Sequence, residues 1–298
     1  MAQTITAWLK VAKKQLLEAG IDSARLDALL LLENGLNETR EWVLAHIDEP
    51  LPAVITEDLN KKLLQRLEHT PLAYIIGSKE FYGREFKVTE DVLIPRPESE
   101  DMIELLLSNS GLDHVSSQMR SGVGGRSLLD PQIKSVDDNP FLVLDIGTGS
   151  GVLAITVQLE IPSATVVATD ISKQALDIAR SNAANLRASV QFHKANLLDL
   201  PTAIKPRVIL ANLPYVPKDL ITSEEITKEP ALAIFSGADG LDLYGTFWQQ
   251  LANFSPQPMF IVTESLENQH DDMVKLAKIV HYELEETKGL AQLFKSAD

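Results

Sequence analysis

Apolar positions near the start of the chain recur at helical spacing. Trp8, Val11, Leu16 and Leu17 are examples, and residues three or four positions apart lie on one side of a helix. The spacing predicts helices over 4–19, 24–32, 40–46 and 56–68. Thr56 is expected to cap the last of these helices. We interpret the leucines of these segments as the core of a small helical domain.

Short apolar and aromatic runs follow from Pro71, with Gly77 and Gly83 between them. This pattern suits a β-hairpin better than a helix. Arg96 and Glu98, close behind the hairpin, are expected to fasten it to the domain that follows, through a structural ion pair rather than through direct contact with a substrate. Residues 108–139 are rich in Ser, Gly, Asp and Asn and show no periodicity, which predicts a long loop.

Strand and helix patterns alternate beyond residue 140. We expect strands over 141–146, 165–168, 190–192 and 208–211, helices over 151–159 and 173–185, and further elements from the apolar runs 247–254, 259–263, 273–280 and 292–295. Such alternation is typical of a mainly parallel sheet covered on both faces. The chain is therefore predicted to be α/β, with a helical domain over 1–72, a hairpin linker over 73–92 and an α/β domain over 93–298.

The composition is that of an ordinary globular chain with an acidic charge. The 298 residues include 27 Lys and Arg against 42 Asp and Glu, a net charge of −15, and no cysteine. The lack of thiols excludes disulfides, thiolate metal sites and a thiol nucleophile, and it agrees with a cytoplasmic location. The charge disfavours direct binding of nucleic acid, and no apolar run is long enough for a membrane span. The six histidines lack the spacing of metal ligands, so no metal site is expected.

A glycine-rich segment at the end of the strand 141–146 is the strongest local motif. Its residues are Asp145, Ile146, Gly147, Thr148, Gly149, Ser150 and Gly151. Glycines let the backbone turn sharply and approach a ligand closely. The spacing matches neither the dinucleotide fingerprint nor the phosphate-binding P-loop. The segment therefore predicts a ligand-binding turn of another kind.

Asp170 follows the next predicted strand, at the same edge of the sheet as the glycine turn. A carboxylate at this place can accept hydrogen bonds from both hydroxyls of a ribose. Together with Asp145, it favours a nucleoside cofactor that carries positive charge. S-adenosyl-L-methionine fits, because it has a sulfonium and an ammonium but no phosphate. A helix cap or a solvated strand end is the alternative interpretation of Asp170.

The segment Asn212-Leu213-Pro214-Tyr215 follows the strand 208–211 and reaches the same edge. The asparagine oxygen and the Leu213 carbonyl can accept the two hydrogens of a planar amino group, while Tyr215 packs on its face. An amide or arylamine nitrogen is a poor nucleophile because its lone pair is delocalised, and two acceptors would orient it. The segment predicts a planar amine as methyl acceptor, with no strong general base.

These motifs together resemble the amino-methylating class of S-adenosylmethionine-dependent methyltransferases. The segments 71–77, 81–83, 92–98, 229–232 and 237–241 narrow the resemblance to the peptide chain release factor N5-glutamine methyltransferases. The resemblance implies a substrate-gripping helical domain, a hairpin linker and a Rossmann-like class I methyltransferase domain with a mainly parallel seven-stranded sheet. It also implies methyl transfer to the side-chain amide nitrogen of the glutamine in the Gly-Gly-Gln loop of class 1 release factors.

The resemblance also implies roles for particular residues. It assigns the turn from Gly147 to Gly151 to the methionine part of the cofactor, Asp170 to its ribose, and Asn212, Pro214 and Tyr215 to the glutamine and to catalysis. Asn196 stands where the family tends to carry an acid, with Leu197 beside it at the adenine side. Leu213 stands where the family usually has a proline.

Two other functions stay open. Asn-Leu-Pro-Tyr also occurs in ribosomal RNA adenine dimethyltransferases, so the chain could be an adenine or cytosine amino methyltransferase acting on RNA or DNA. Leu213 and the altered C-terminal end leave open a non-catalytic regulatory protein that binds the cofactor. The acidic charge favours a protein substrate over a nucleic acid. Glu264 and Gln269, near the substrate edge, are interpreted as scaffold rather than as acid or base.

Overall fold

The structure, a computed structural model, describes residues 3–109, 141–200, 204–220 and 223–297. It divides into a helical unit, Met1–Ser78 with Thr222–Lys228, and a sheet unit, Lys79–Ile221 with Glu229–Asp298. From residue 110 onward, the loop expected over 108–139 lies outside the described residues. Its first two residues belong to a helix of the sheet unit.

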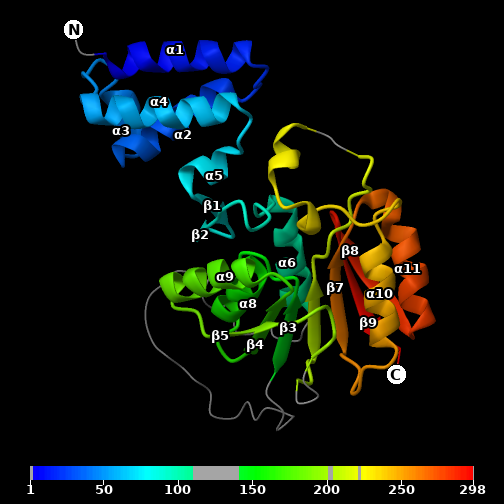
Figure 1. The fold of residues 1–298 in the computed structure, drawn as a ribbon. Coiled ribbons are helices and arrows are strands. Elements are labelled where there is room, and N and C mark those ends of the chain that lie inside the picture. Colours follow the sequence, from blue (N-terminus) through cyan, green and yellow to red (C-terminus); the bar gives the residue numbers. More distant parts are fainter. Residues whose placement is uncertain (1–2, 110–140, 201–203, 221–222, 298) are drawn as a thin grey trace. The chain divides into compact units, whose positions relative to one another are not determined.

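The helical unit has the helices that the sequence predicted. Its elements are α1 (Ile5–Glu18), α2 (Ala24–Leu36), α3 (Arg40–Ala45), α4 (Ala53–Leu67), α5 (Leu72–Ile76) and the short 3-10 helix η2 (Glu225–Lys228) (Figure 1). The expected cap of α4 is wrong, because the helix starts at Ala53, before Thr56. Pro52 sets the entry into this helix, since proline fixes a suitable backbone angle. The Thr56 hydroxyl instead donates to the Pro52 carbonyl at 3.1 Å.

Apolar side chains of α1, α2 and α4 form the core of the helical unit. Its buried members include Ile5, Trp8, Leu16, Leu31, Leu32 and Leu59. The Trp8 indole N–H donates to the Asn60 side-chain oxygen at 2.9 Å, which satisfies the polar atom of that ring. The interpretation of the leucines as core is confirmed for these positions, whereas Leu17 and Leu64 are exposed.

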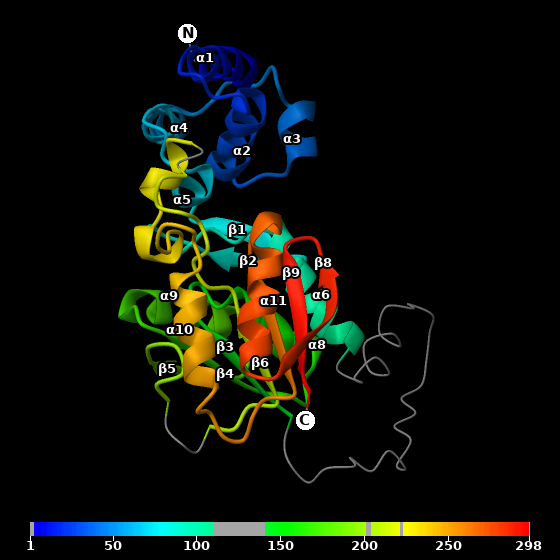
Figure 2. The same ribbon diagram turned by 90° about the vertical axis from the view of Figure 1, so that its right-hand side faces the viewer.

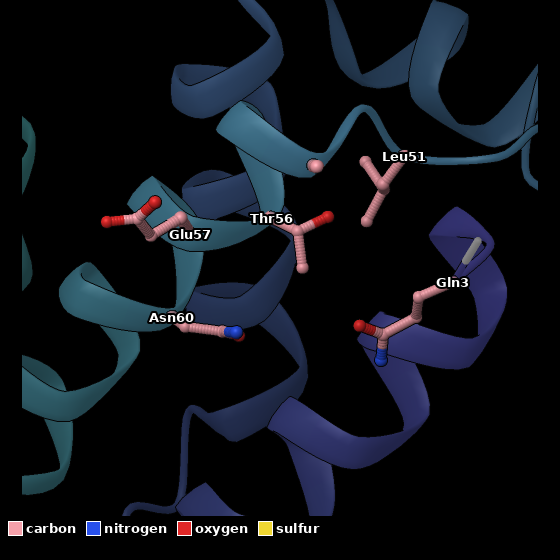
Figure 3. A pocket seen from close by; sticks show the side chains of 6 residues that line it. Gln3, Leu51, Thr56, Glu57 and Asn60 are labelled. Carbon is pink, nitrogen blue, oxygen red and sulfur yellow. The ribbon is translucent and has the colours of Figure 1, made fainter. Parts of the chain in front are cut away.

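An open hollow of about 390 Å³ lies in the helical unit between the start of the chain and α4 (Figure 3). It is lined by Gln3, Leu51, Ala53, Thr56, Glu57 and Asn60. None of these residues is a candidate site residue of the sequence analysis. The hollow therefore has no connection with the predicted chemistry.

Arg66 of α4 is a buried cation in the helical unit, with only 2% of its surface exposed. Its Nε donates to Asp27 Oδ2 of α2 at 2.7 Å, and its Nη2 donates to Glu225 Oε1 of η2 at 2.5 Å. Asp27 is itself 4% exposed, so this ion pair has lost its water on both sides. These contacts fasten α2 and η2 to α4.

We expect Arg66→Met to destabilise the helical unit by about 3–5 kcal/mol, because the Asp27 carboxylate would stay buried without its partner. Hydrogen exchange of the α2 and α4 amides in the full chain measures this loss. Lys61→Met on the same helix is the matched control. Lys61 pairs with Glu57 at 2.8 Å, but both side chains are exposed, so no change is expected. Wild-type protection in Arg66→Met would show that the pair contributes nothing.

The segment after Pro71 differs from the expected hairpin. Residues Leu72–Ile76 form α5, because proline can start a helix without an N–H and Gly77 ends it with φ 87°. The hairpin is confined to β1 (Ser78–Phe81) and β2 (Arg84–Lys87). A short helical turn thus stands where the sequence pattern suggested a strand.

The sheet unit alternates strand and helix. Its strands are β3 (Leu142–Ile146), β4 (Thr165–Asp170), β5 (Val190–Lys194), β6 (Val208–Ala211), β7 (Phe260–Glu264), β8 (Tyr282–Lys288) and β9 (Ala291–Ser296). Its helices are α6 (Glu100–Asn109), α8 (Val152–Glu160), α9 (Lys173–Leu186), α10 (Asp242–Leu251) and α11 (His270–Ile279), with 3-10 turns η1 (Pro97–Ser99), η3 (Ala231–Ala233) and η4 (Glu267–Gln269).

These strands form one seven-stranded sheet in the order β5-β4-β3-β6-β7-β9-β8. Neighbours from β5 to β7 are parallel, whereas β9 runs antiparallel to both β7 and β8. Helices α6, α8 and α9 cover one face, and α10 and α11 cover the other (Figures 1 and 2). The expected Rossmann-like α/β fold with a mainly parallel seven-stranded sheet is confirmed.

Polar contacts fasten the hairpin to the sheet unit. Arg84 pairs with Glu160 at the end of α8, at 2.6 Å. The side chain of Asn182, in α9, accepts from the Lys87 N–H at 2.8 Å and donates to the Lys87 carbonyl at 3.0 Å. The same amide donates to the Ser150 carbonyl at 2.9 Å. One buried asparagine therefore joins the hairpin to the glycine-rich turn.

Candidate active site

The motif residues of the sequence analysis lie along one edge of the sheet. Asp145 is near the end of β3, Asp170 ends β4, and Asn212 follows β6 directly. Glu264 ends β7, the next strand along. Since these four strands run parallel, their carboxyl ends meet at the same edge. This edge is the candidate active site.

The turn between β3 and α8 leaves room for a ligand. Gly147, Gly149 and Gly151 have φ of 70°, 55° and 86°, a left-handed conformation that favours glycine. A Cβ on Gly149 would meet no atom within 4 Å, so the space beside it is open. A Cβ on Gly147 would lie 3.4 Å from the Leu213 side chain, which places the turn next to the Asn212 segment.

Asp145 is a buried carboxylate beneath this turn, with 1% of its surface exposed. Its Oδ2 accepts from the Thr148 hydroxyl at 2.6 Å and from the Ala154 N–H at 3.2 Å. Burial raises the pKa of Asp145 to about 7, against the opposing effect of these two hydrogen bonds. Its Oδ1 has no hydrogen-bond partner within the described ranges. An unpartnered carboxylate oxygen here fits a positively charged ligand.

Asp170 connects β4 to the glycine turn. Its Oδ2 accepts from the Gly149 N–H at 2.9 Å, and its Oδ1 accepts from the Ser172 N–H at 2.8 Å. Burial raises the pKa of this carboxyl, whereas the backbone hydrogen bonds lower it. A carboxylate offers about four acceptor sites, so both oxygens can each accept another bond. The helix cap is Ser172, which accepts from the Ala175 N–H, and not Asp170.

Asn196 and Leu197 lie just after β5. The Ala195 N–H donates to the Asp170 carbonyl at 3.1 Å, which brings this segment to the end of β4. Leu197 has φ 51° and a buried side chain that packs in the core on the α10 and α11 face. Asn196 is exposed. Their assignment to the adenine side of the cofactor stays a prediction.

The Asn212 side chain is held in one orientation. Its Nδ2 donates at 2.9 Å to the Oγ of Ser99, the last residue of η1. In the described parts of the chain, no donor bonds its side-chain oxygen. That oxygen is therefore left as an acceptor for a ligand.

Further contacts fix the rest of the Asn212 segment. The Leu213 N–H donates to the Tyr244 hydroxyl at 3.3 Å, and the Tyr215 hydroxyl donates to Glu264 Oε1 at 2.7 Å. Gln269 Nε2 donates to the Tyr215 carbonyl at 2.8 Å. Burial raises the pKa of Tyr215, which keeps its phenol protonated. A proline in place of Leu213 would have no N–H, so the leucine adds a tether to the segment.

Arg96 forms a structural ion pair, and its partner is Glu229. Its Nη2 lies 2.5 Å from Glu229 Oε1, and Glu229 Oε2 accepts from the Ile94 N–H at 3.1 Å. Glu229 is buried, so the pair is partly desolvated. These contacts fix the residues after the hairpin against the segment that begins at Glu229.

Sequence reasoning missed several residues that shape this site. Ser99 precedes Asn212 by 113 positions, so no local pattern connects the two. Tyr244 belongs to an amphipathic helix, where an aromatic residue is expected to pack in the core. Glu264 was interpreted only as scaffold. Its place at the end of a strand next to β6 was the available signal for a closer role.

The described residues contain no group of three or more His, Cys, Asp or Glu that could hold a metal ion. In the same ranges, no helix is long and apolar enough to cross a membrane. The edge brings together an open glycine turn, the carboxyl groups of Asp145 and Asp170, and a free amide oxygen. This arrangement can hold a cationic nucleoside beside a planar amine.

Two family models match parts of the chain. Residues 7–77 match the PrmC N-terminal domain, and residues 127–238 match ribosomal protein L11 methyltransferase (PrmA). Among solved structures, the hMettl16 catalytic domain in complex with MAT2A 3'UTR hairpin 1 has a TM-score of 0.52 and 12% identity, and covers 86% of this chain and 85% of that chain. This likeness supports the fold alone.

Curated relatives extend over most of the chain. A bifunctional methyltransferase of Rickettsia felis is 37% identical over 82% of this chain, which spans 48% of that relative; the chain thus has about half the length of such relatives. A release factor glutamine methyltransferase of Bacillus subtilis is 34% identical over 88% of this chain and 85% of its own length. The predicted resemblance is confirmed, and the chain belongs to the family of release factor glutamine methyltransferases.

Proposed function

We propose that the chain methylates the side-chain amide nitrogen of the glutamine in the Gly-Gly-Gln motif of class 1 peptide chain release factors. It would thereby modulate translation termination in the cytoplasm. The observation that carries the proposal is the hydrogen bond from Asn212 Nδ2 to Ser99, because it leaves the Asn212 oxygen free to accept from an amide NH2. Relatives named release factor glutamine methyltransferase support the choice of substrate.

Membership of this family makes S-adenosyl-L-methionine the methyl donor, and its sulfonium supplies an activated methyl group. We assign its binding to Asp145, Gly147, Thr148, Gly149, Ser150, Gly151, Asp170, Asn196, Leu197 and Asn212. Three observations support the fit: the open space at Gly149, the unpartnered Oδ1 of Asp145 and the acceptor capacity of Asp170. Each suits a cationic nucleoside that carries no phosphate.

The Asn212 segment would hold the glutamine. The Asn212 oxygen and the Leu213 carbonyl accept the two hydrogens of the amide, Pro214 restricts the backbone between them, and Tyr215 lies against the amide plane. When bound, the cofactor would supply the methyl group from its sulfonium and would leave as a neutral thioether. The amide nitrogen that accepts the methyl group would carry positive charge until it releases one proton to water. Two fixed acceptors favour that charge, so no strong base is needed before transfer.

We further propose that the helical domain, residues 1–72, recognises the substrate protein, with residues 73–92 as linker and 93–298 as catalytic domain. The chain would bind neither nucleic acid nor membrane directly, in keeping with its net charge of −15. The nucleic-acid methyltransferase alternative predicts transfer to RNA instead.

The proposal is tested by incubating the purified chain with methyl-labelled S-adenosyl-L-methionine. One sample receives a class 1 release factor, another the same factor with alanine for the glutamine of Gly-Gly-Gln, and a third total RNA. We expect label in the unaltered factor alone. Label in RNA alone, or equal label in both factors, would refute the proposed substrate.

Asp170→Ala is expected to weaken the binding of S-adenosyl-L-methionine about 10- to 100-fold, because hydrogen bonds to a charged group contribute about 1.5–3 kcal/mol. Calorimetric titration of the full chain measures the dissociation constant. Asp177→Ala is the control, since this exposed carboxylate of α9 pairs only with Arg180 on its own helix among the contacts of the described residues. Unchanged affinity in Asp170→Ala would remove Asp170 from the cofactor site.

A further inference from the structure

Glu264 lies beside the candidate site at the end of β7. The proposed function gives it no part in cofactor binding, substrate binding or catalysis. It has 1% of its surface exposed, and its Oε1 accepts from the Tyr215 hydroxyl at 2.7 Å. A carboxylate buried so deeply is costly unless hydrogen bonds satisfy it. Its Oε2 has no hydrogen-bond partner in the described portion of the chain. One acceptor of this group is thus unsatisfied.

Ser99 offers a hydrogen for that acceptor. Its Oγ accepts from Asn212 Nδ2 at 2.9 Å, and its side chain is buried. Its own hydroxyl hydrogen has no acceptor among the hydrogen bonds of the described residues. Strands β6 and β7 pair in parallel with Ala211 opposite Thr263, so Asn212 and Glu264 follow at neighbouring positions of the same edge. Burial raises the pKa of the Glu264 carboxyl, and the side chains of Ser99, Tyr215 and Asn212 oppose that shift.

The single hydrogen of a hydroxyl decides the direction of these contacts. When Ser99 directs its hydrogen to Glu264, its oxygen can only accept from Asn212. Asn212 must then turn its NH2 toward Ser99 and its oxygen away. Without the carboxylate, Ser99 could donate to the Asn212 oxygen instead, and the amide could adopt the flipped orientation.

We propose that Glu264 is a positioning residue for the methyl acceptor, acting on Asn212 through Ser99 and on Tyr215 directly. The inference rests on the proposed function, which assigns Asn212 and Tyr215 to the substrate amide. Glu264 does not touch that amide. It determines which atom of Asn212 faces the substrate, so that the site presents an acceptor in advance of binding.

Two single variants test this inference. Glu264→Gln preserves size but replaces one acceptor oxygen by a donor NH2, so the orientation of Asn212 is no longer imposed. Ser99→Ala removes the intervening hydroxyl. For each, we expect kcat for release factor methylation to fall about 10- to 100-fold, with an unchanged dissociation constant for S-adenosyl-L-methionine. Ser265→Ala is the matched control, because this buried serine has no partner for its Oγ in the described ranges.

The double variant separates a positioning role from two unrelated effects. Because Glu264 acts on Asn212 through Ser99, adding Ser99→Ala to Glu264→Gln should cause no further loss of kcat. Losses that multiply would overturn the inference, as would weaker cofactor binding or a melting temperature in Ser99→Ala below that of Ser265→Ala. Wild-type kcat in both single variants would overturn it while leaving the proposed function intact. Failure of the unaltered chain to label a release factor would instead refute the proposed function, and the inference with it.

Discussion

Asn212→Ala is expected to lower kcat for glutamine methylation by about 10²–10³-fold while S-adenosyl-L-methionine binds almost as before, because nine other assigned residues still hold the cofactor. The loss follows because the side-chain oxygen is a fixed partner for the amide at the moment when charge develops on its nitrogen, and one preorganised polar contact of this kind contributes that much. The Asn212 side chain donates to Ser99 at 2.9 Å, so its removal takes no hydrogen bond from the glycine turn or from Asp170.

Single-turnover methylation of a class 1 release factor and calorimetric titration of the cofactor measure the two effects separately. Asn253→Ala is a control, because this exposed asparagine lies beyond α10 and contacts none of the motif residues through a hydrogen bond of the described chain. A normal kcat in Asn212→Ala would contradict the placement of Asn212 at the methyl acceptor.

Gly240→Ala is expected to impair both stability and turnover. Gly240 has φ 86°, and a Cβ there would lie 2.0 Å from the Tyr215 carbonyl oxygen and 2.5 Å from Gln269 Nε2. Both atoms belong to the contact that holds the Asn212 segment. The left-handed backbone costs about 1–2 kcal/mol for an L-residue and overpacking about 1–3 kcal/mol, so we expect a loss of about 2–5 kcal/mol. Displacement of Tyr215 should also lower kcat about 100-fold.

Thermal unfolding of the full chain and kcat for a release factor check this expectation. Gly245→Ala in α10 is the matched control, because a Cβ at that position meets no atom within 4 Å. Alanine is the better helix former, so Gly245→Ala should gain about 1 kcal/mol and retain its activity. If the two glycine variants melted and turned over alike, Gly240 could not be the point where the chain approaches Tyr215.

The sequence was sufficient to predict an element or a site residue wherever the contacts that determine it are local or periodic. Strands β3, β4 and β6 are buried on both faces and therefore read as apolar runs. The glycine turn and Asp170 stand at strand ends, where the topology of a parallel sheet alone places them at one edge. The same logic located Asn212. Their hydrogen bonds could not be anticipated, because these depend on backbone groups brought together by the turn.

The sequence failed where an element has no apolar pattern of its own. Only Tyr282 is buried among the seven residues of β8, which pairs with β9 alone at the edge of the sheet, so nothing marked it as a strand. Residues Leu72–Ile76 carry the β-rich composition of a hairpin, but Pro71 and Gly77 enclose them in a helical turn. The role of Ser99 could not be predicted for a third reason: it depends on Asn212, a partner far along the chain.

The helical unit is built from two separate stretches of chain, Met1–Ser78 and Thr222–Lys228, joined through Arg66 and Glu225. Hybrids between relatives are affected by this arrangement. A crossover near residue 78 would replace Arg66 and its surroundings while the Glu225 stretch stayed that of the original parent. Chimeras would therefore need to exchange both stretches together. In evolution, a substitution of Arg66 or Glu225 should be followed by a compensating substitution of the other.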